Sequence, residues 1–259
     1  MRDPRDLHEV PPGMVKSMEA GHPYPRAFVT VSGAHLYGFP SQDSDVDLRG
    51  VHLLPLDEIV GLDTGAETIT WTWDQAGVEA DLVTHDLAKF CRLLLNRNGY
   101  VLEQLVSPLV VATSPVHEEL LAQVSGLLTS NHAHHYLGFA RNQWRLFEKS
   151  EELKPLLYTF RVLMTGIHLM RTGEVVADLG SLTPDYGPVY VPDLIEAKRA
   201  AEHGALPADA PDRDRLLADV TALTVRLEDE RARSVLPERP SARPALHDLV
   251  VRTRLAPRG

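Results

Sequence analysis

Hydrophobic and polar residues alternate with a period of two in the N-terminal part of the chain. Residues 27–31 form a short apolar run rich in β-branched side chains, which predicts a buried strand. Residues 68–73 alternate strictly between threonine and larger apolar side chains. Residues 74–77 are typical of a turn and lead to a second alternating run at 78–83. The pattern therefore predicts one strand followed by a β-hairpin.

After residue 86 the hydrophobic period lengthens to about 3.6 residues, which is typical of helices that bury one face. Caps mark some of the helix starts, such as Ser114 followed by Pro115. The clearest apolar stripe belongs to one amphipathic helix and comprises Leu216, Leu217, Val220, Leu223 and Leu227. The pattern predicts helices at residues 87–95, from 100 onward, 115–128, 134–149, 154–171, 193–202, 212–233 and 246–251, with a loop at 179–192.

These two periods together predict an α+β fold. Residues 1–110 are expected to form a small mixed β-sheet core with flanking helices, and residues 111–259 an all-helical C-terminal part. A chain of 259 residues is long enough to bury a sizeable core in either part. We therefore expect two domains, divided near residue 110.

The composition is that of an ordinary globular protein, with 44% hydrophobic and 24% charged residues. No apolar run approaches the length that spans a membrane, and the N-terminus lacks the apolar core of a signal peptide. We therefore expect a cytoplasmic protein that does not contact a membrane. The net charge of −10 disfavours loose, phosphate-driven affinity for nucleic acid, although a local basic groove would be compatible with it.

Cysteine and histidine chemistry is not favoured by the sequence. The single cysteine, Cys91, excludes an internal disulfide and a thiolate zinc cluster. It falls on the apolar face of a predicted helix, and we interpret it as a small buried hydrophobe. His132, His134 and His135 are neighbours at a helix start, so they cannot all point at one metal ion.

The clearest chemical pattern lies between the first strand and the hairpin. The turn at 32–34 contains Gly33, and a glycine there allows a sharp bend whose free backbone N–H groups can bind phosphate. Asp45 and Asp47 share one face of the next strand, with their Cβ atoms roughly 6–7 Å apart. Two carboxylates so close require a cation or a proton, and hard divalent ions such as Mg²⁺ prefer oxygen ligands.

Other side chains would complete such a site. The second hairpin strand would bring Asp81 back towards the aspartate pair, and Glu79, two residues earlier on the same face, is the alternative. Arg49 shares the strand face of the aspartates, where it could either neutralise them or contact a phosphate. His35 lies in the turn itself and could meet a phosphate or the carboxylates.

The run GAHLYGFPSQDSDVDLRGVHLLP at residues 33–55 resembles the DNA polymerase β-like nucleotidyltransferase superfamily. It is most similar to the predicted nucleotidyltransferases of the RNA repair pathway DNA polymerase β family. The resemblance covers most of the first 175 residues. Its further matching positions are Asp81, residues 86–90, Asn98, Leu102, Glu103, Lys154, Tyr158 and Arg161.

The resemblance implies an enzyme that transfers a nucleoside monophosphate from an NTP to a hydroxyl acceptor with two Mg²⁺ or Mn²⁺ ions. Asp45 and Asp47 would bridge the ions, and Asp81 would bind the catalytic ion and help to deprotonate the acceptor. The helical part would complete the cleft and select the acceptor, which is an RNA 3′ end, a protein side chain or a small-molecule hydroxyl. The NTP would lie against Ser32, Gly33, Ala34, His35, Arg49 and Lys154.

One position departs from the superfamily pattern. Relatives usually have Gly-Ser where this chain has Gly33-Ala34, and the serine hydroxyl is expected to touch the triphosphate. In the catalytic interpretation, Ser32 or the backbone amides take over this contact. The alternative is a non-catalytic nucleotide-binding or antitoxin-like partner module with a degenerate active site.

Overall fold

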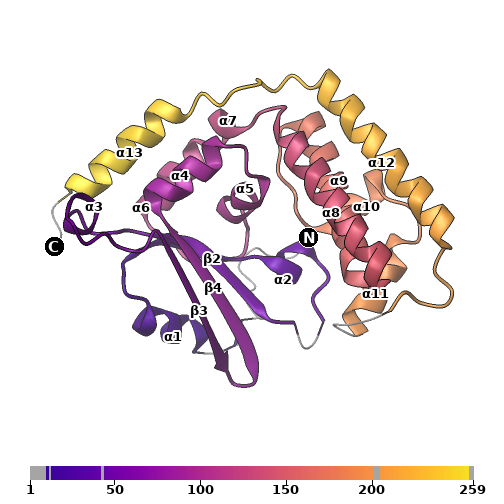
Figure 1. The fold of residues 1–259 in the computed structure, drawn as a ribbon, viewed down its shortest axis with the longest axis horizontal. Coiled ribbons are helices and arrows are strands. Elements are labelled where there is room, and N and C mark those ends of the chain that lie inside the picture. Colours follow the sequence, from indigo (N-terminus) through magenta and orange to yellow (C-terminus); the bar gives the residue numbers. More distant parts are fainter. Residues whose placement is uncertain (1–9, 12, 42–43, 201–204, 257–259) are drawn as a thin grey trace. The chain divides into compact units, whose positions relative to one another are not determined.

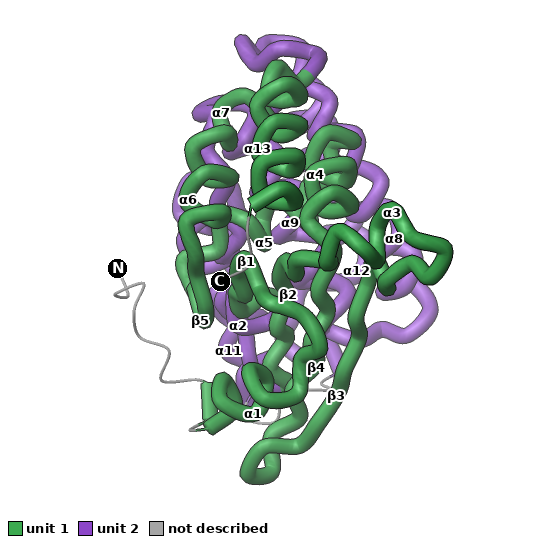
Figure 2. Tube along the Cα trace, turned by 90° about the vertical axis from the view of Figure 1, so that its left-hand side faces the viewer, with its two compact units in different colours: residues 1–33, 45–127, 240–259 green, residues 34–44, 128–239 purple. Residues whose placement is uncertain are grey.

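The computed structural model describes residues 10–11, 13–41, 44–200 and 205–256. The chain divides into two compact units, and each unit combines segments that are distant in the sequence (Figure 2). The first unit contains residues 1–33, 45–127 and 240–259, and the second contains residues 34–44 and 128–239. Residues 34–44 therefore leave the first unit between two of its strands.

The first unit is built on a five-stranded sheet with the strand order β3-β4-β2-β1-β5. β2 and β4 are parallel, and the other neighbouring strands are antiparallel (Figure 1). The predicted small mixed sheet is thus confirmed, including its first strand and its hairpin. The strands are β1 Arg26–Val31, β2 Val46–His52, β3 Thr68–Gln75, β4 Val78–Asp86 and β5 Val110–Ala112.

Helices cover both faces of this sheet (Figure 1). On one face, Met14 and Met18 of α1 pack against the apolar side chains of the strands, which are Val29, Val31, Val46, Leu48, Ala80 and Leu82. On the other face, the Phe28 ring stacks on His117 of α6, with 4.2 Å between ring centroids. The unit's helices are α1 Met14–Gly21, α3 Asp57–Val60, α4 Leu87–Leu95, α5 Gly99–Leu105, α6 Pro115–Ala122, α7 Val124–Leu127 and α13 Arg243–Leu255.

The second unit is a helical bundle around α9, which packs against α8, α10, α11 and α12. Gly173 ends α9 in the left-handed conformation with a φ of 73°, which glycine adopts at little cost. The short helix α2, Gly33–Tyr37, starts at the last residue of the segment 1–33. The bundle confirms the predicted helical C-terminal part, and its helices are α8 His132–Ser150, α9 Leu153–Thr172, α10 Leu179–Tyr186, α11 Val191–Ala200 and α12 Arg213–Arg233.

Several predicted elements were wrong in detail. The loop expected at 179–192 contains the helix α10, because Asp178 caps it and burial of Leu179 and Leu182 outweighs the helix-breaking tendency of Pro184. The helix expected at 115–128 is interrupted at Gln123. The strand β5 was not predicted, because three residues carry too little pattern. The expected end of α11 at residue 202 lies outside the described residues.

The C-terminal helix α13 is tied to the sheet unit by a buried ion pair. Arg254 pairs with Asp86, and both side chains are less than a tenth exposed. Arg254 also donates through Nη1 to the carbonyl oxygen of Leu54 at 2.6 Å. Asp86 itself caps α4 by accepting from the Ala88 amide at 3.0 Å. This ion pair therefore holds the end of α13 against the end of β4.

Cys91 lies on the buried face of α4 and is 4% exposed. Burial raises the pKa of its thiol to about 12, so the thiol stays protonated at neutral pH. The interpretation of Cys91 as a small buried hydrophobe is confirmed.

We expect the stability of the sheet unit to fall in mild acid because of His52. Its ring is fully buried between the Thr84 hydroxyl and the Ala66 carbonyl, and burial lowers its pKa from 6.5 to about 4. Between these two pH values the unfolded chain binds a proton that the folded chain excludes, so the free energy of unfolding decreases as pH falls. The decrease should reach about 3 kcal/mol at pH 4.

Urea unfolding at pH 7 and at pH 4 measures this effect. His52→Asn should lose most of the decrease, whereas His247→Asn, at an exposed position on α13, should keep it. An equal pH dependence in wild type and His52→Asn would contradict the assignment to His52.

Candidate active site

Two predicted site carboxylates lie side by side on neighbouring parallel strands. In the pairing of β2 with β4, Asp47 is directly opposite Asp81. The residues next to Asp47, Val46 and Leu48, are buried in the core on the α1 side, so Asp47 and Asp81 lie on the opposite sheet face. Parallel pairing thus brings together residues that are 34 positions apart in the sequence.

Arg49 joins these two carboxylates. Its Nη2 lies 2.6 Å from Asp47 Oδ1 and 3.0 Å from Asp81 Oδ2. Its Nη1 donates to the carbonyl oxygens of Asp81 at 2.6 Å and of Leu48 at 2.9 Å. Its Nε donates to the Tyr100 hydroxyl at 3.2 Å. The guanidinium is therefore fixed by hydrogen bonds along its whole edge and supplies the positive charge that the carboxylate pair requires.

The electrostatics of Arg49 follow from this arrangement. Burial alone would lower the pKa of its guanidinium, but Tyr100, Asp47 and Asp81 outweigh burial and raise the pKa above its ordinary value. The Asp47 and Asp81 side chains remain about a third exposed, at 29% and 32%, whereas that of Arg49 is 11% exposed. A ligand can therefore reach the two carboxylates from solvent, whereas the guanidinium of Arg49 is mostly buried.

Gly33 is required where it stands by two features. Its φ is 61°, a left-handed conformation that glycine adopts at little cost. A Cβ atom at this position would lie 1.8 Å from Asp47 Oδ2, which no side chain permits. The Ser32 amide also donates to the Asp47 carbonyl oxygen at 2.8 Å. The turn after β1 is therefore packed directly against one of the two carboxylates.

The hydroxyl of Ser32 has no hydrogen-bond partner among the described residues, although it is buried. Ser32 follows Val31, whose strand partner is Leu48, so Ser32 is level with Asp47 on the same sheet face. A buried hydroxyl without a partner costs free energy unless a ligand or water satisfies it. This atom is therefore a suitable contact for a phosphate oxygen at the turn.

A divalent cation fits the chemistry of the carboxylate pair. The donors are carboxylate oxygens, which Mg²⁺ and Mn²⁺ prefer, and both carboxylates are about a third exposed, so a metal ion can compete with Arg49 for them. Asp45, one residue before β2, is exposed, and so is Glu79. Across the described parts of the chain, no three acidic, histidine or cysteine side chains are grouped closely enough to form a ready metal site. The structure brings Asp47 and Asp81 together, whereas Asp45 lies at an exposed position just before β2.

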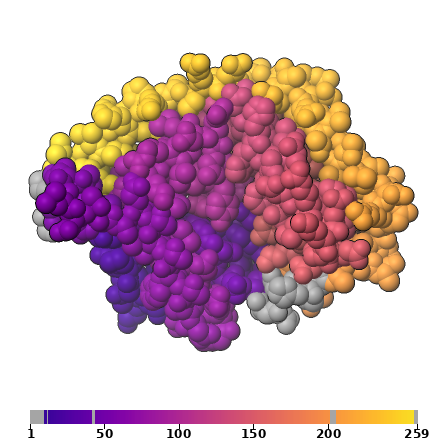
Figure 3. All heavy atoms as spheres, viewed as in Figure 1, coloured from indigo at the N-terminus to yellow at the C-terminus, as the bar shows by residue number. Residues whose placement is uncertain are grey.

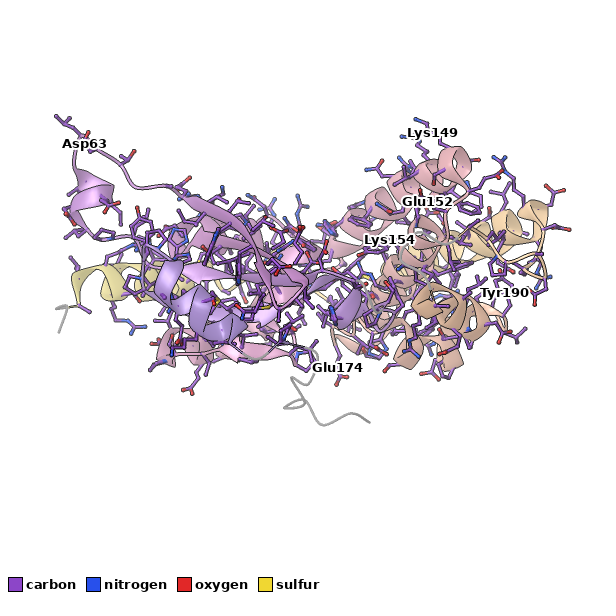
Figure 4. All side chains as sticks on the ribbon, turned by 90° about the horizontal axis from the view of Figure 1, so that it is seen from below. Asp63, Lys149, Glu152, Lys154, Glu174 and Tyr190 are labelled. Atoms are coloured by element: carbon purple, nitrogen blue, oxygen red, sulfur yellow. The ribbon has the colours of Figure 1, made fainter. Side chains whose placement is uncertain are left out.

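The other predicted site residues belong to the second unit. Ala34 is buried, and His35 is half-buried in α2. Lys154 is half-buried in the first turn of α9 (Figure 4). Arg161, seven residues further on, is 2% exposed, and its guanidinium lies 3.7 Å from the centroid of the Tyr37 ring. Arg161 and Tyr37 therefore pack on one another inside this unit.

Tyr100 is a site residue that the sequence analysis missed. It lies in the first turn of α5, where its amide is capped by the Asn98 side chain at 3.0 Å. The cap fixes the position of the tyrosine, and its hydroxyl then accepts from Arg49. The start of a helix after Asn98 could be predicted, but the contact of Tyr100 with Arg49 depends on how α5 packs on the sheet.

We expect Gly33→Ala to disrupt the site much more than an ordinary glycine substitution. The added methyl group must displace the Asp47 carboxylate as well as strain the backbone, so the free energy of unfolding should fall by about 3 kcal/mol. Gly77→Ala is the matched control, because Gly77 has a φ of 86° but no atom within 4 Å of the added methyl group. It should cost only about 1 kcal/mol. Equal losses in urea unfolding would contradict the contact between Gly33 and Asp47.

Comparisons with known proteins define the class of protein to which this arrangement belongs. The profile of the RlaP family, described as the RNA repair pathway DNA polymerase beta family, matches residues 8–252. The chain belongs to this family of nucleotidyltransferases related to DNA polymerase β. The resemblance inferred from residues 33–55 is thereby confirmed.

Two individual proteins are similar to the chain. The uncharacterized protein MJ0002 of Methanocaldococcus jannaschii is 28% identical over 216 residues, covering 83% of this chain and 88% of its own. A crystal structure of a nucleotidyltransferase-like protein from Exiguobacterium sibiricum 255-15 aligns over 85% of this chain and 75% of its own, with 13% identity and a TM-score of 0.31. No helix in the described ranges is long and apolar enough to cross a membrane.

Proposed function

We propose that the chain transfers a nucleoside monophosphate from an NTP to a hydroxyl acceptor. The observation that carries this proposal is the pairing of Asp47 with Asp81, with the Gly33 turn packed against Asp47. This arrangement joins a pair of carboxylates that can bind a cation to a glycine turn at the start of α2, and a metal-chelated triphosphate requires both a cation site and a phosphate-binding turn. The family description favours an RNA 3′ end as acceptor, and a protein side chain or a small-molecule hydroxyl is compatible with the same core.

Asp45, Asp47 and Asp81 would hold two Mg²⁺ or Mn²⁺ ions. When bound, such ions stabilise negative charge on the attacking and leaving oxygens of an in-line displacement. The acceptor oxygen forms a bond to the α-phosphorus, and the bond from that phosphorus to the bridging oxygen breaks to release pyrophosphate. Asp81 would help to deprotonate the acceptor hydroxyl, since its carboxylate is about a third exposed and can be reached by an acceptor.

The remaining side chains would position the triphosphate. The backbone amides of Gly33 and Ala34, together with the Ser32 hydroxyl, would bind phosphate oxygens, since the Ser32 amide already donates to the Asp47 carbonyl oxygen. Arg49, His35 and Lys154 would supply positive or hydrogen-bonding groups to the same phosphates. In the free chain Arg49 is committed to the carboxylates, so a bound metal would release it for this task.

A second candidate function is a nucleotide-binding module without activity. It is favoured by Ala34, which replaces the serine expected in relatives of this superfamily. The Ser32 hydroxyl opposes this candidate, because it offers the missing hydroxyl one position earlier on the sheet face of Asp47.

A transfer assay separates the two functions. The chain is incubated with each NTP labelled at the α-phosphate, with Mg²⁺ or Mn²⁺, and with RNA, protein and small-molecule acceptors. We expect label on an acceptor, no label with EDTA, and no label when the γ-phosphate carries it instead. Metal-dependent NTP binding without transfer to any acceptor would favour the binding module, and absence of NTP binding would refute both functions.

A further inference from the structure

The long helix α8 presents a basic stripe to solvent that the proposed chemistry does not use. Its residues recur at three- and four-residue spacing, so they share one face of the helix. Arg141, Arg145 and Lys149 lie at successive four-residue steps and are exposed. The opposite face buries Ala133, Tyr136, Ala140 and Phe147 in the bundle. Figure 3 shows the atoms of α8 at the surface turned towards the viewer, and Figure 4 shows Lys149 extending away from its ribbon.

The three charges of this stripe are not neutralised within the described part of the chain. None of them forms an ion pair or a hydrogen bond through its side chain with another described residue. Glu148, the only acidic residue on α8, is paired with Arg213 of α12 at 2.9 Å. In a chain with a net charge of −10, an unpaired basic stripe points to an anionic partner.

Gly138 lies on the same face, three residues before Arg141 and seven before Arg145. A glycine inside a helix destabilises it relative to alanine. No atom lies within 4 Å of a Cβ added at Gly138, so packing within the described chain does not require a glycine there. A glycine on a binding surface allows the backbone of a partner to approach closely. Because Gly138 has no side chain, the helix surface next to Arg141 is open to a partner.

We propose that this face of α8 binds the sugar-phosphate backbone of single-stranded RNA. Guanidinium groups bind phosphate in a bidentate manner, and two of the three charges are arginines. Trp144 is half-buried and lies three residues from Arg141, between the stripe and the buried face, with its ring centroid 5.2 Å from that of Phe147; the exposed part of this ring offers a surface on which a base can stack. The aromatic ring favours a nucleic acid over an acidic protein. The choice of RNA rests on the proposed function, in which RNA is the acceptor strand.

Fluorescence anisotropy with a labelled 20-nucleotide RNA tests the surface. The triple variant Arg141→Gln, Arg145→Gln, Lys149→Gln should bind about 100-fold more weakly at 0.1 M salt, because three phosphate contacts are lost. The slope of log K against log salt concentration should become about 2 smaller in magnitude. The control triple variant Arg215→Gln, Arg233→Gln, Arg239→Gln changes the charge of the same unit by an equal amount. Its affinity for the RNA should lie within threefold of that of the wild type.

Gly138→Leu separates shape from charge. A Cβ atom added at Gly138 meets no atom within 4 Å, and leucine favours a helix over glycine, so the melting temperature should not fall. RNA binding should weaken about tenfold, because the side chain holds the strand away from the helix. Unchanged RNA binding by Gly138→Leu, or an equal loss in the two triple variants, would overturn the proposal. Absence of RNA binding by the wild type would also overturn it.

Two further arms identify the partner. A DNA strand of the same sequence should depend on the stripe in the same way, because the contacts are to phosphate. A labelled polyglutamate that binds as tightly and depends equally on the stripe would overturn the proposal in favour of an acidic protein. If RNA binding depends on the stripe but no nucleotidyl transfer occurs, the RNA-binding role of the stripe is supported and the proposed function is refuted. If the wild type and the triple variant at Arg141, Arg145 and Lys149 label RNA equally, the proposed function is supported and the RNA-binding role of the stripe is refuted.

Discussion

Replacing Asp47 by asparagine is expected to lower metal-dependent nucleotidyl transfer at least about 10³-fold, because the loss of one metal-holding carboxylate removes several kcal/mol of transition-state stabilisation. The substitution keeps the size of the side chain, and Asp47 Oδ2 lies close to Gly33, so the packing at the turn is preserved. The measurement is the rate of label transfer from the α-phosphate at saturating NTP.

The same experiment with neighbouring residues decides which carboxylates matter. Asp81→Asn should be as damaging as Asp47→Asn, since the two side chains face each other across β2 and β4. Glu79→Gln is the control, because Glu79 is exposed and lies two residues nearer the hairpin turn. It should retain at least about a third of the wild-type rate, which corresponds to less than 1 kcal/mol. A loss confined to Glu79→Gln would contradict the assignment of Asp81.

Replacing Arg49 by methionine is the second change with a large expected effect. It removes the shared counter-ion of Asp47 and Asp81 and leaves two carboxylates facing each other. Breaking a buried ion pair on one side is strongly destabilising, and with these carboxylates about a third exposed we expect a loss of about 2–3 kcal/mol in metal-free buffer. Thermal unfolding with EDTA measures this loss.

Divalent metal should then stabilise the variant more than the wild type. In the wild type a metal ion competes with Arg49 for the carboxylates, whereas in Arg49→Met it meets no competitor. The rise in melting temperature on adding Mn²⁺ should therefore be larger in the variant. Arg92→Met breaks the exposed pair with Glu67 and serves as control, with a change in stability within about 0.5 kcal/mol and a metal response equal to that of the wild type. If Mn²⁺ raises the melting temperature of Arg49→Met by no more than that of the wild type, the role of Arg49 as the counter-ion of the two aspartates is contradicted.

The sheet could be predicted because its strands carry strong local patterns. Thr68–Gln75 and Val78–Asp86 form the hairpin that strict alternation indicated, and Val46 and Leu48 are buried as the period of two required. The helix α12 could likewise be predicted from its stripe of apolar residues. One member of that stripe, Leu217, is 44% exposed, because a 3.6-residue period places it at the edge of the buried face.

The features that could not be predicted depend on contacts between distant segments. The parallel pairing of β2 with β4 places Asp81 level with Asp47, and no local signal fixes that register. The three bonds of Arg49 to Tyr100 and the two aspartates come from separate elements. The return of α13 to the sheet unit rests on the pair of Arg254 with Asp86, which are 168 positions apart. α10 forms despite Pro184 because its apolar face is buried.

Binding of Mn²⁺ in the presence of a non-hydrolysable NTP tests the central claim most directly. Paramagnetic resonance can count the bound ions in the wild type, in Asp47→Asn, in Asp81→Asn and in Glu79→Gln. Two bound ions are expected in the wild type and in Glu79→Gln, and at least one fewer in each aspartate variant. Full retention of both ions in Asp81→Asn would contradict a metal site shared between β2 and β4.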